Sequence, residues 1–224
     1  MKSFLFSLLF LFCIVYRVVA QRDVVLNHYW AMPSIYNPAV AGSTDYLEGG
    51  LSGRWQHAGS TDAPIMVVAT AHMPLEFLER RHGVGAVISY ENVGKNHFVQ
   101  MGVQYAFQMK LGKGRLHLSL QPTILNWKFN GSSYKNGDST STFIPYPFEE
   151  NNITKEQIPT TDVNDNKLDL SLGAMYFYKN WHFGISCTHI TKPTFQFSDT
   201  CKISCYPNLY CTIGSILKYN MYSL

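Results

Sequence analysis

The stretch from Val99 to Leu111, VQMGVQYAFQMKL, carries an apolar residue at every odd position and a polar or small residue at every even one. Side chains of a β-strand point alternately to opposite faces, so this period of two predicts a long strand with one apolar and one polar face. The stretch exceeds the ~5–6 residues usual in globular sheets and is close to the ~9–11 that a tilted strand needs to cross a bilayer. It therefore indicates a membrane-spanning strand.

Residues 1–20 have the pattern of a secretory signal peptide. A single lysine precedes an apolar run over residues 4–15, and modest or small residues at 18–20 offer a cleavage site. A membrane-anchoring helix would need ~20 apolar residues, so the run is too short to span. We therefore expect an exported protein with a signal at residues 1–20 and one mature domain at residues 21–224.

The rest of the chain contains no apolar window long enough for a transmembrane helix. In lipid only helices and closed barrels satisfy all their backbone hydrogen bonds, so a membrane-bound chain must then be a barrel. The 14 Tyr, 14 Phe and 4 Trp residues suit the aromatic girdles of such barrels, and a net charge of +3 gives no reason to expect nucleic acid. The sequence thus predicts an all-β fold, an antiparallel transmembrane β-barrel of the outer-membrane type.

Further alternating stretches predict about eight or nine strands in all. They lie at residues 47–57, 65–73, 83–90, 168–178, 181–188 and 202–213. The tight turn at 112–114 joins residues 99–111 to a return strand that reaches Phe129, with glycine supplying positive φ. After Pro122 the apolar phase of this strand shifts, which predicts a bulge or an edge position.

Residues 130–166 are rich in Asn, Ser, Gly and Pro and predict a long polar loop. Loops of this length are uncommon in compact domains and usually carry function or disorder. Membrane barrels have short turns on one side and long loops on the other. We therefore expect this loop to lie outside the cell and to contact an exported partner.

Two polar clusters resemble reactive sites only weakly. The first consists of His57, Ser60 and Asp62. It has the residue types of a catalytic triad, but no strained nucleophile elbow surrounds the serine, so loop-lining polar residues are the preferred interpretation. The second consists of Asp162, Asn164, Asn166 and Asp169. It resembles part of a calcium loop that lacks both the glycine and the bidentate glutamate, so only a loose calcium contact stays open.

The mature chain carries four cysteines crowded near its C-terminus. They are Cys187, Cys201, Cys205 and Cys211. With His189 they suggest zinc, but apart from Cys201 and Cys205 their spacing lacks the close pairs of zinc sites, so we expect no metal. Three of them share one face of the strand predicted over residues 202–213. They are interpreted as small apolar side chains or as an exported disulfide whose pairing the sequence does not define.

Arg54 lies on the polar face of the strand predicted over residues 47–57. In a barrel that face lines the interior, where a charge is tolerated and can anchor a plug or loop. In a soluble sandwich the same arginine would face solvent. The sequence alone leaves both readings open.

Residues 36–43, YNPAVAGS, resemble the N-terminal NPAxAGS signature of the PorP/SprF family, membrane proteins of Bacteroidetes type IX secretion and gliding. The matching residues are Asn37, Pro38, Ala39, Ala41 and Gly42. A second match follows at family-like spacing, with Trp and Gln placed differently from the usual order. Its residues are Arg54, Trp55, Gln56, Gly59 and Pro64. With paired strands at 167–178 and 181–186, the resemblance covers about residues 27–200.

The resemblance implies an outer-membrane protein without catalytic residues or cofactors. It would lie in outer-membrane lipid, work with periplasmic motor and ring components of type IX secretion, and support the export or surface attachment of an adhesin-like protein. Family members usually continue for several more strands, so a short or C-terminally truncated member with an incomplete barrel is expected. The residues alone also allow a soluble exported barrel or sandwich that binds a small ligand, or an exported hydrolase.

Overall fold

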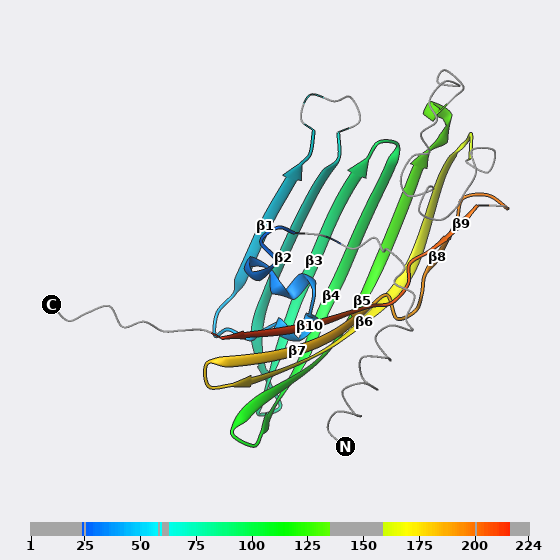
Figure 1. The fold of residues 1–224 in the computed structure, drawn as a ribbon. Coiled ribbons are helices and arrows are strands. Elements are labelled where there is room, and N and C mark those ends of the chain that lie inside the picture. The colour runs from blue at the N-terminus through cyan, green and yellow to red at the C-terminus, as the bar shows by residue number, and fades with distance from the viewer. Residues whose placement is uncertain are drawn as a thin grey trace, which may run out of the picture.

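The computed structural model describes residues 24, 26–57, 59, 63–134, 159–199 and 201–215. Eight strands form one antiparallel sheet in the order β1-β2-β3-β4-β5-β6-β7-β10. Their bounds are β1 Glu48–Trp55, β2 Ile65–Phe77, β3 Arg80–Val93, β4 Asn96–Leu111, β5 Gly114–Asn130, β6 Asp162–Tyr178, β7 Trp181–Thr188 and β10 Asn208–Ser215. The sheet curls strongly into a half-barrel, which confirms the predicted all-β barrel architecture (Figure 1).

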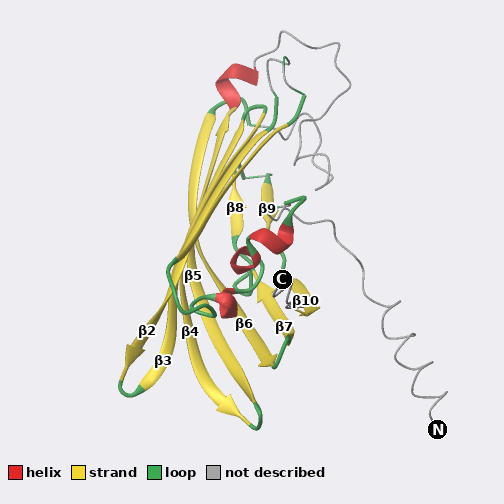
Figure 2. Cartoon of the chain, turned by 90° about the vertical axis from the view of Figure 1, so that its left-hand side faces the viewer, coloured by secondary structure: helices red, strands yellow, loops and turns green. Residues whose placement is uncertain are grey.

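The concave side of the sheet holds two inserts (Figure 2). The first is the N-terminal segment, residues 26–46, which contains three short 3-10 helices. They are η1 Tyr29–Ala31, η2 Pro33–Ile35 and η3 Pro38–Val40. The second is a small hairpin of β8 Thr194–Gln196 and β9 Lys202–Ser204, inserted between β7 and β10. A fourth 3-10 helix, η4 Gly131–Tyr134, follows β5.

The two faces of the sheet differ as the alternation in residues 99–111 predicts. On the convex face of β4, Met101 and Val103 are 53% and 64% exposed. On its concave face, Gln104 and Gln108 are buried. The convex face therefore presents apolar side chains outward, while the concave face is covered by the two inserts.

The two ends of the sheet carry connections of different length. At one end three turns of two residues each, 78–79, 112–113 and 179–180, join neighbouring strands. The opposite end carries the long connections 56–64 and 131–161, together with one two-residue turn at 94–95. Short turns at one end and long loops at the other are typical of outer-membrane barrels. Among the described residues no helix is long and apolar enough to cross a membrane.

The prediction of a bulge or an edge position at Pro122 is wrong. β5 lies between β4 and β6 and keeps one register with each, and Pro122 faces Leu170 of β6. The ladder with β4 lacks bridges around Pro122, because proline has no N–H to donate. The apolar phase shifts because the residues beyond Pro122 point to the concave face, where the β8–β9 hairpin packs on them. They are Leu125, Trp127 and Phe129.

The predicted loop over residues 130–166 is shorter than expected. β6 begins at Asp162, so residues 162–166 are strand, and 135–158 lie outside the described residues. The amide of Asn126 in β5 donates to Asn164 and Asn166 across the strands, at 2.6 Å and 2.7 Å. The composition of these polar residues predicts a loop, but their side chains form hydrogen bonds with one another on the surface of the sheet.

The strand predicted over residues 202–213 is two strands in the structure. β9 pairs with β8, whereas β10 pairs with β7. Between them the Cys205 N–H donates to the Pro193 carbonyl, and Pro207 follows. A proline cannot supply a ladder hydrogen bond, so the strand ends before it and restarts on a different partner.

Candidate functional site

The motif at residues 36–43 lies at the centre of the N-terminal segment. Asn37 caps η3, since its Oδ1 accepts the Ala39 N–H at 2.9 Å. Pro38 takes the first position of the helix, where a free N–H would lack a partner. Ala39 and Ala41 have no exposed surface. The motif is therefore a compact turn whose small side chains allow it to lie against the sheet.

Asn37 also joins the segment to two strands of the sheet. Its Nδ2 donates to the carbonyls of Ala174 in β6 and Ile185 in β7, at 3.2 Å and 3.4 Å. Next to it, the Ser186 hydroxyl donates to the Tyr36 carbonyl at 2.5 Å. One buried amide thus caps its own turn and bridges two strands.

Polar side chains of the sheet hold the rest of the segment by its main-chain carbonyls. Gln104 Nε2 donates to the Ser34 carbonyl at 2.7 Å, and Gln108 Nε2 donates to the Gly42 carbonyl at 2.8 Å. His117 Nδ1 donates to the Ala39 carbonyl at 3.1 Å. All three side chains are buried. The alternation of Gln in residues 99–111 signals this inward face, but the sequence does not reveal that another part of the chain occupies it.

Glycines allow the segment and the sheet to approach closely. Gly42 has a φ of +67°, which favours glycine. A Cβ on Gly83 would lie 1.9 Å from the Ala41 carbonyl oxygen, and one on Gly173 would lie 2.2 Å from Asn37 Oδ1. Side chains at either position would push the segment away from the sheet.

The second motif lies elsewhere, at the β1–β2 connection. Arg54 faces the concave side of β1 beside Met66, whereas Trp55 is exposed on the convex side. The Gln56 N–H donates to the Pro64 carbonyl at 3.0 Å and closes the connection. Gly59 has a φ of +103° within it. These residues shape a turn, and the structure does not bring them next to Asn37.

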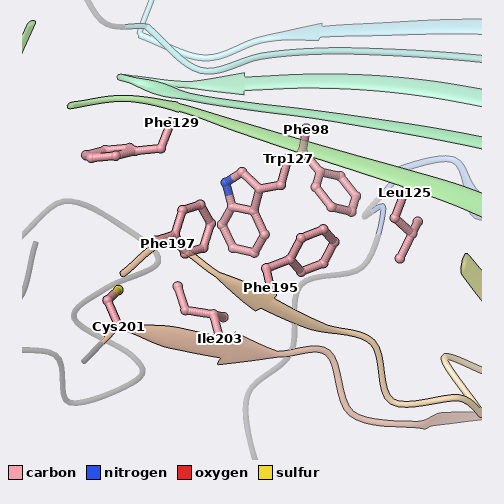
Figure 3. Packing of buried hydrophobic residues seen from close by; sticks show 8 residues of the cluster. All are labelled: Phe98, Leu125, Trp127, Phe129, Phe195, Phe197, Cys201 and Ile203. Atoms are coloured by element: carbon pink, nitrogen blue, oxygen red, sulfur yellow. The ribbon is translucent and has the colours of Figure 1, made fainter. Parts of the chain in front are cut away.

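The β8–β9 hairpin covers the other part of the concave face by aromatic packing (Figure 3). Trp127 lies at the centre, with ring centroids 5.0 Å from Phe197, 5.2 Å from Phe195 and 5.7 Å from Phe98, all nearly edge-to-face. Its indole N–H donates to Asn96 Oδ1 at 3.0 Å.

The model of the family described as "Type IX secretion system membrane protein PorP/SprF" matches residues 18–223. The chain belongs to the PorP/SprF family. No curated protein and no solved structure matches the chain significantly. The match extends from before the N-terminal segment to beyond β10, so both inserts lie within the matched residues.

The calcium-like cluster of this PorP/SprF protein is split between two faces of β6. Asn164 and Asn166 face outward and bind Asn126. Asp169 faces inward, where its carboxylate lies 2.7 Å from His189 Nδ1 and accepts the Thr191 hydroxyl at 2.7 Å. The spacing in sequence therefore does not produce a common site, because alternate strand positions point apart. The Asp169 carboxylate instead ties the chain leaving β7 to β6.

Cys187, Cys201, Cys205 and Cys211 form no disulfide with one another. Cys201 is buried in the connection between β8 and β9, Cys205 is half-buried after β9, and Cys211 is exposed on β10. The prediction that these three share one strand face is wrong, because the chain turns away between β9 and β10. Within the described ranges no group of three or more His, Cys, Asp or Glu side chains could hold a metal.

The triad candidate is not assembled by what the structure describes. His57 is exposed with a φ of +52° at the end of β1, and Ser60 and Asp62 lie outside the described residues. The family is one of secretion-system membrane proteins.

A basic hollow of about 260 Å³ lies at the short-turn end of the sheet. It lies between the β4–β5 and β6–β7 turns. Its charged lining residues are Lys110, Lys113, Arg115 and Lys179. No carboxylate lines it, so it presents concentrated positive charge at the end opposite the long connections.

Proposed function

We propose that this protein lies in the outer membrane, after export through its N-terminal signal, and supports the export or surface attachment of a partner protein without catalysing a reaction. The observation that carries the proposal is the apolar convex face of a half-barrel whose concave side is filled by its own chain. Membership of a type IX secretion membrane-protein family supports the setting.

The dimensions of the convex face support a bilayer location. Along β6 its outward residues are apolar or aromatic from Leu168 to Tyr178, ten residue steps, and Asn166 and Asn164 precede them. At ~3.3 Å per residue this is ~33 Å of strand, or ~23 Å of height at a tilt of ~45°. The apolar band of outer-membrane barrels is ~25 Å tall.

Aromatic side chains mark the lower border of this band. Tyr176 and Tyr178 end β6, and Trp181 and Phe183 stack beside them at the start of β7 with ring centroids 6.5 Å apart. Aromatic girdles at the membrane interfaces are typical of such barrels. The short-turn end then faces the periplasm and the long connections face outside.

The test of membrane location is fractionation combined with a charge on the convex face. Val103→Arg places a cation near the middle of the band and should destabilise the inserted protein by ~2–4 kcal/mol, enough to prevent assembly. Val103→Leu and Gln100→Arg, on the convex and concave faces of β4, are the matched controls and should assemble. Recovery of the unaltered protein in the soluble periplasm would instead favour the exported small-ligand binder.

The exported partner is proposed to meet the long-connection end. Replacing residues 135–158 with a Gly-Ser linker of equal length keeps Ser132 and Asp162, which bond at 2.7 Å and close the base of the connection. Barrel assembly should be unchanged, and surface display of the partner should be lost. Unchanged surface display of the partner would show that residues 135–158 are not needed for the proposed function.

The basic hollow is proposed to meet periplasmic components of the secretion machinery. Concentrated charge speeds encounter with an oppositely charged partner and makes it salt-dependent. The combined change Lys110→Glu, Lys113→Glu and Lys179→Glu should lower co-purification of those components at low salt. The same change to Gln should have a smaller effect, and equal recovery with Glu, Gln and native residues would exclude the hollow as a contact.

A further inference from the structure

The basic hollow lies one row of side chains below the attachment of the N-terminal segment. Strand pairing places Lys110 opposite Arg115 and Arg115 opposite Phe177, which makes one row across β4, β5 and β6. The next row on the same face, two residues along each strand, contains Gln108 opposite His117. At ~3.3 Å per residue the two rows are about 7 Å apart. Gln108 and His117 both donate to carbonyls of the segment, so the hollow and the segment share the concave side of the sheet.

The lining of the hollow is electrostatically unbalanced. Lys110 and Arg115 lie directly opposite each other, and like charges in this position on neighbouring strands repel. Lys113 and Lys179 add two further cations from the turns, and none of the residues that line the hollow is acidic. An anionic group placed among these four side chains would relieve the repulsion. The hollow therefore has the charge of an anion-binding site.

The position and the lining of the hollow favour an acidic peptide as the anion. The row of Lys110, Arg115 and Phe177 is on the concave side, whereas lipid contacts the apolar convex side of a membrane barrel. A lipid phosphate therefore does not reach the row. The ring of Phe177 forms part of the lining, and the methylene groups of Asp and Glu side chains can pack against a ring. An acidic peptide thus complements both the charged and the apolar part of the lining, whereas a free inorganic anion complements only the charge.

Phe177 belongs to the packing of the N-terminal segment as well as to the hollow. It packs against the buried cluster that contains Ala39 and Val40 of η3, and its ring centroid lies 4.7 Å from that of His117. His117 in turn donates to the Ala39 carbonyl at 3.1 Å. If the segment leaves the sheet, Phe177 loses its contacts with η3 and one wall of the hollow loses its support. The hollow is therefore complete only while the segment is attached.

We propose that the hollow binds an acidic peptide segment of the periplasmic partner, and that this binding strengthens the attachment of the N-terminal segment. The first half rests on the proposed function, which makes the hollow the contact with periplasmic components. The second half follows from linkage. A ligand that binds only the attached form stabilises that form, and attachment of the segment in turn strengthens binding of the ligand. Docking of a partner at the short-turn end thereby changes how firmly the interior of the half-barrel is filled.

The experiment measures binding and attachment separately, on the full chain purified in detergent at low salt. The probe is fluorescently labelled hexaglutamate, with hexaglutamine as the uncharged control, and fluorescence anisotropy measures binding. Attachment is measured by the alkylation rate of Ser34→Cys in a variant whose four mature cysteines are changed to Ser, because Ser34 is buried within the segment. Hexaglutamate at ten times its dissociation constant should slow alkylation about tenfold. Hexaglutamine should neither bind nor slow the reaction.

Two sets of variants assign these effects to the hollow and to Phe177. The combined change Lys110→Gln, Lys113→Gln and Lys179→Gln should abolish both binding and slowing. Lys128→Gln, exposed near the opposite end of β5, is the matched control and should keep both. Phe177→Ala keeps the four cations, so it should still bind hexaglutamate, but most of the slowing should be lost. A full tenfold slowing in Phe177→Ala would overturn Phe177 as the connection between the hollow and the segment.

Three results with the native lining would overturn the proposal. Failure of hexaglutamate to bind would exclude a peptide site, and binding without a change in alkylation would exclude the effect on attachment. Equal slowing by inorganic phosphate at the same ionic strength would assign the hollow to a free anion. All of these are measured on the purified chain alone. A failure here is therefore distinct from a failure of the proposed function, which is measured by fractionation, surface display and co-purification.

Discussion

The two inserts of the concave face are held by different kinds of interaction. The N-terminal segment is attached through its carbonyl groups, which accept from Gln104, Gln108 and His117. The β8–β9 hairpin is attached through rings that surround Trp127. Hydrogen bonds require each donor at one position, whereas apolar packing accepts many arrangements of similar volume. The N-terminal segment is therefore held at defined points along its main chain, whereas the hairpin is held by the packing of its rings.

The largest expected effect on stability is for a variant of the aromatic cluster under the β8–β9 hairpin. Trp127→Ala removes the centre of the cluster and should lower the free energy of unfolding by ~3–5 kcal/mol. Urea titration followed by heat-modifiable gel mobility measures it. Trp127→Phe, which keeps a ring, should lose markedly less, and equal loss in both variants would assign the effect to the indole hydrogen bond.

The same variant has a chemical readout at Cys201. Burial raises the pKa of the Cys201 thiol to about 11, so little reactive thiolate is present near neutral pH. Release of the hairpin in Trp127→Ala should return the thiol to its ordinary pKa and speed alkylation on the order of 100-fold. The rate is measured by mass spectrometry in a variant with the other three mature cysteines changed to Ser. An unchanged rate would show that the hairpin stays in place without Trp127.

Among the variants that disturb the N-terminal segment, Gly173→Val should lower stability most. Its Cβ would meet Asn37 Oδ1 at 2.2 Å, and overpacking of this kind costs ~1–3 kcal/mol or more. The N-terminal segment should become sensitive to protease while the sheet still assembles. Gly49→Val is the control, because its Cβ has nothing closer than the Thr70 carbonyl oxygen at 3.6 Å.

Asn37→Ala tests the bridging amide without adding volume. It leaves the Ala39 N–H, a buried donor, without its side-chain acceptor, and should cost ~1–3 kcal/mol. A double-mutant cycle with Ser186→Ala, which removes the neighbouring bond to Tyr36, should be non-additive. Strict additivity would show that the two bonds hold the segment independently.

The smallest effect is expected for Gln108→Ala. It removes one of several bonds to the segment and should lower stability by ~1 kcal/mol. Lys110→Ala, on the same face of β4 but exposed, is the matched control. A loss of stability as large as that of Asn37→Ala would show that β4, and not the motif around Asn37, provides the main attachment of the segment.

Strands whose two faces differ in polarity could be predicted from sequence, and β4 is the clearest case. The prediction failed where residues typical of loops are part of a paired strand. Asn164 and Asn166 are typical loop residues, yet they satisfy Asn126 across two strands. β8 has three residues, too few for any period to be recognised. The partner of Gln104 could not be predicted from the sequence. A glutamine that faces water in a barrel interior and one that donates to a main-chain carbonyl occupy the same positions of an alternating pattern.

Asn37 has a consequence for the order of folding. Its partners Ala174 and Ile185 lie 137 and 148 positions later in the chain. The N-terminal segment is synthesised first, but the acceptors of Asn37 exist only after β6 and β7 have paired. Contacts of such long range form late and slow the folding of a chain. An early part of the chain is therefore among the last to be fixed, and it fills the concave side only once the strands around it are complete.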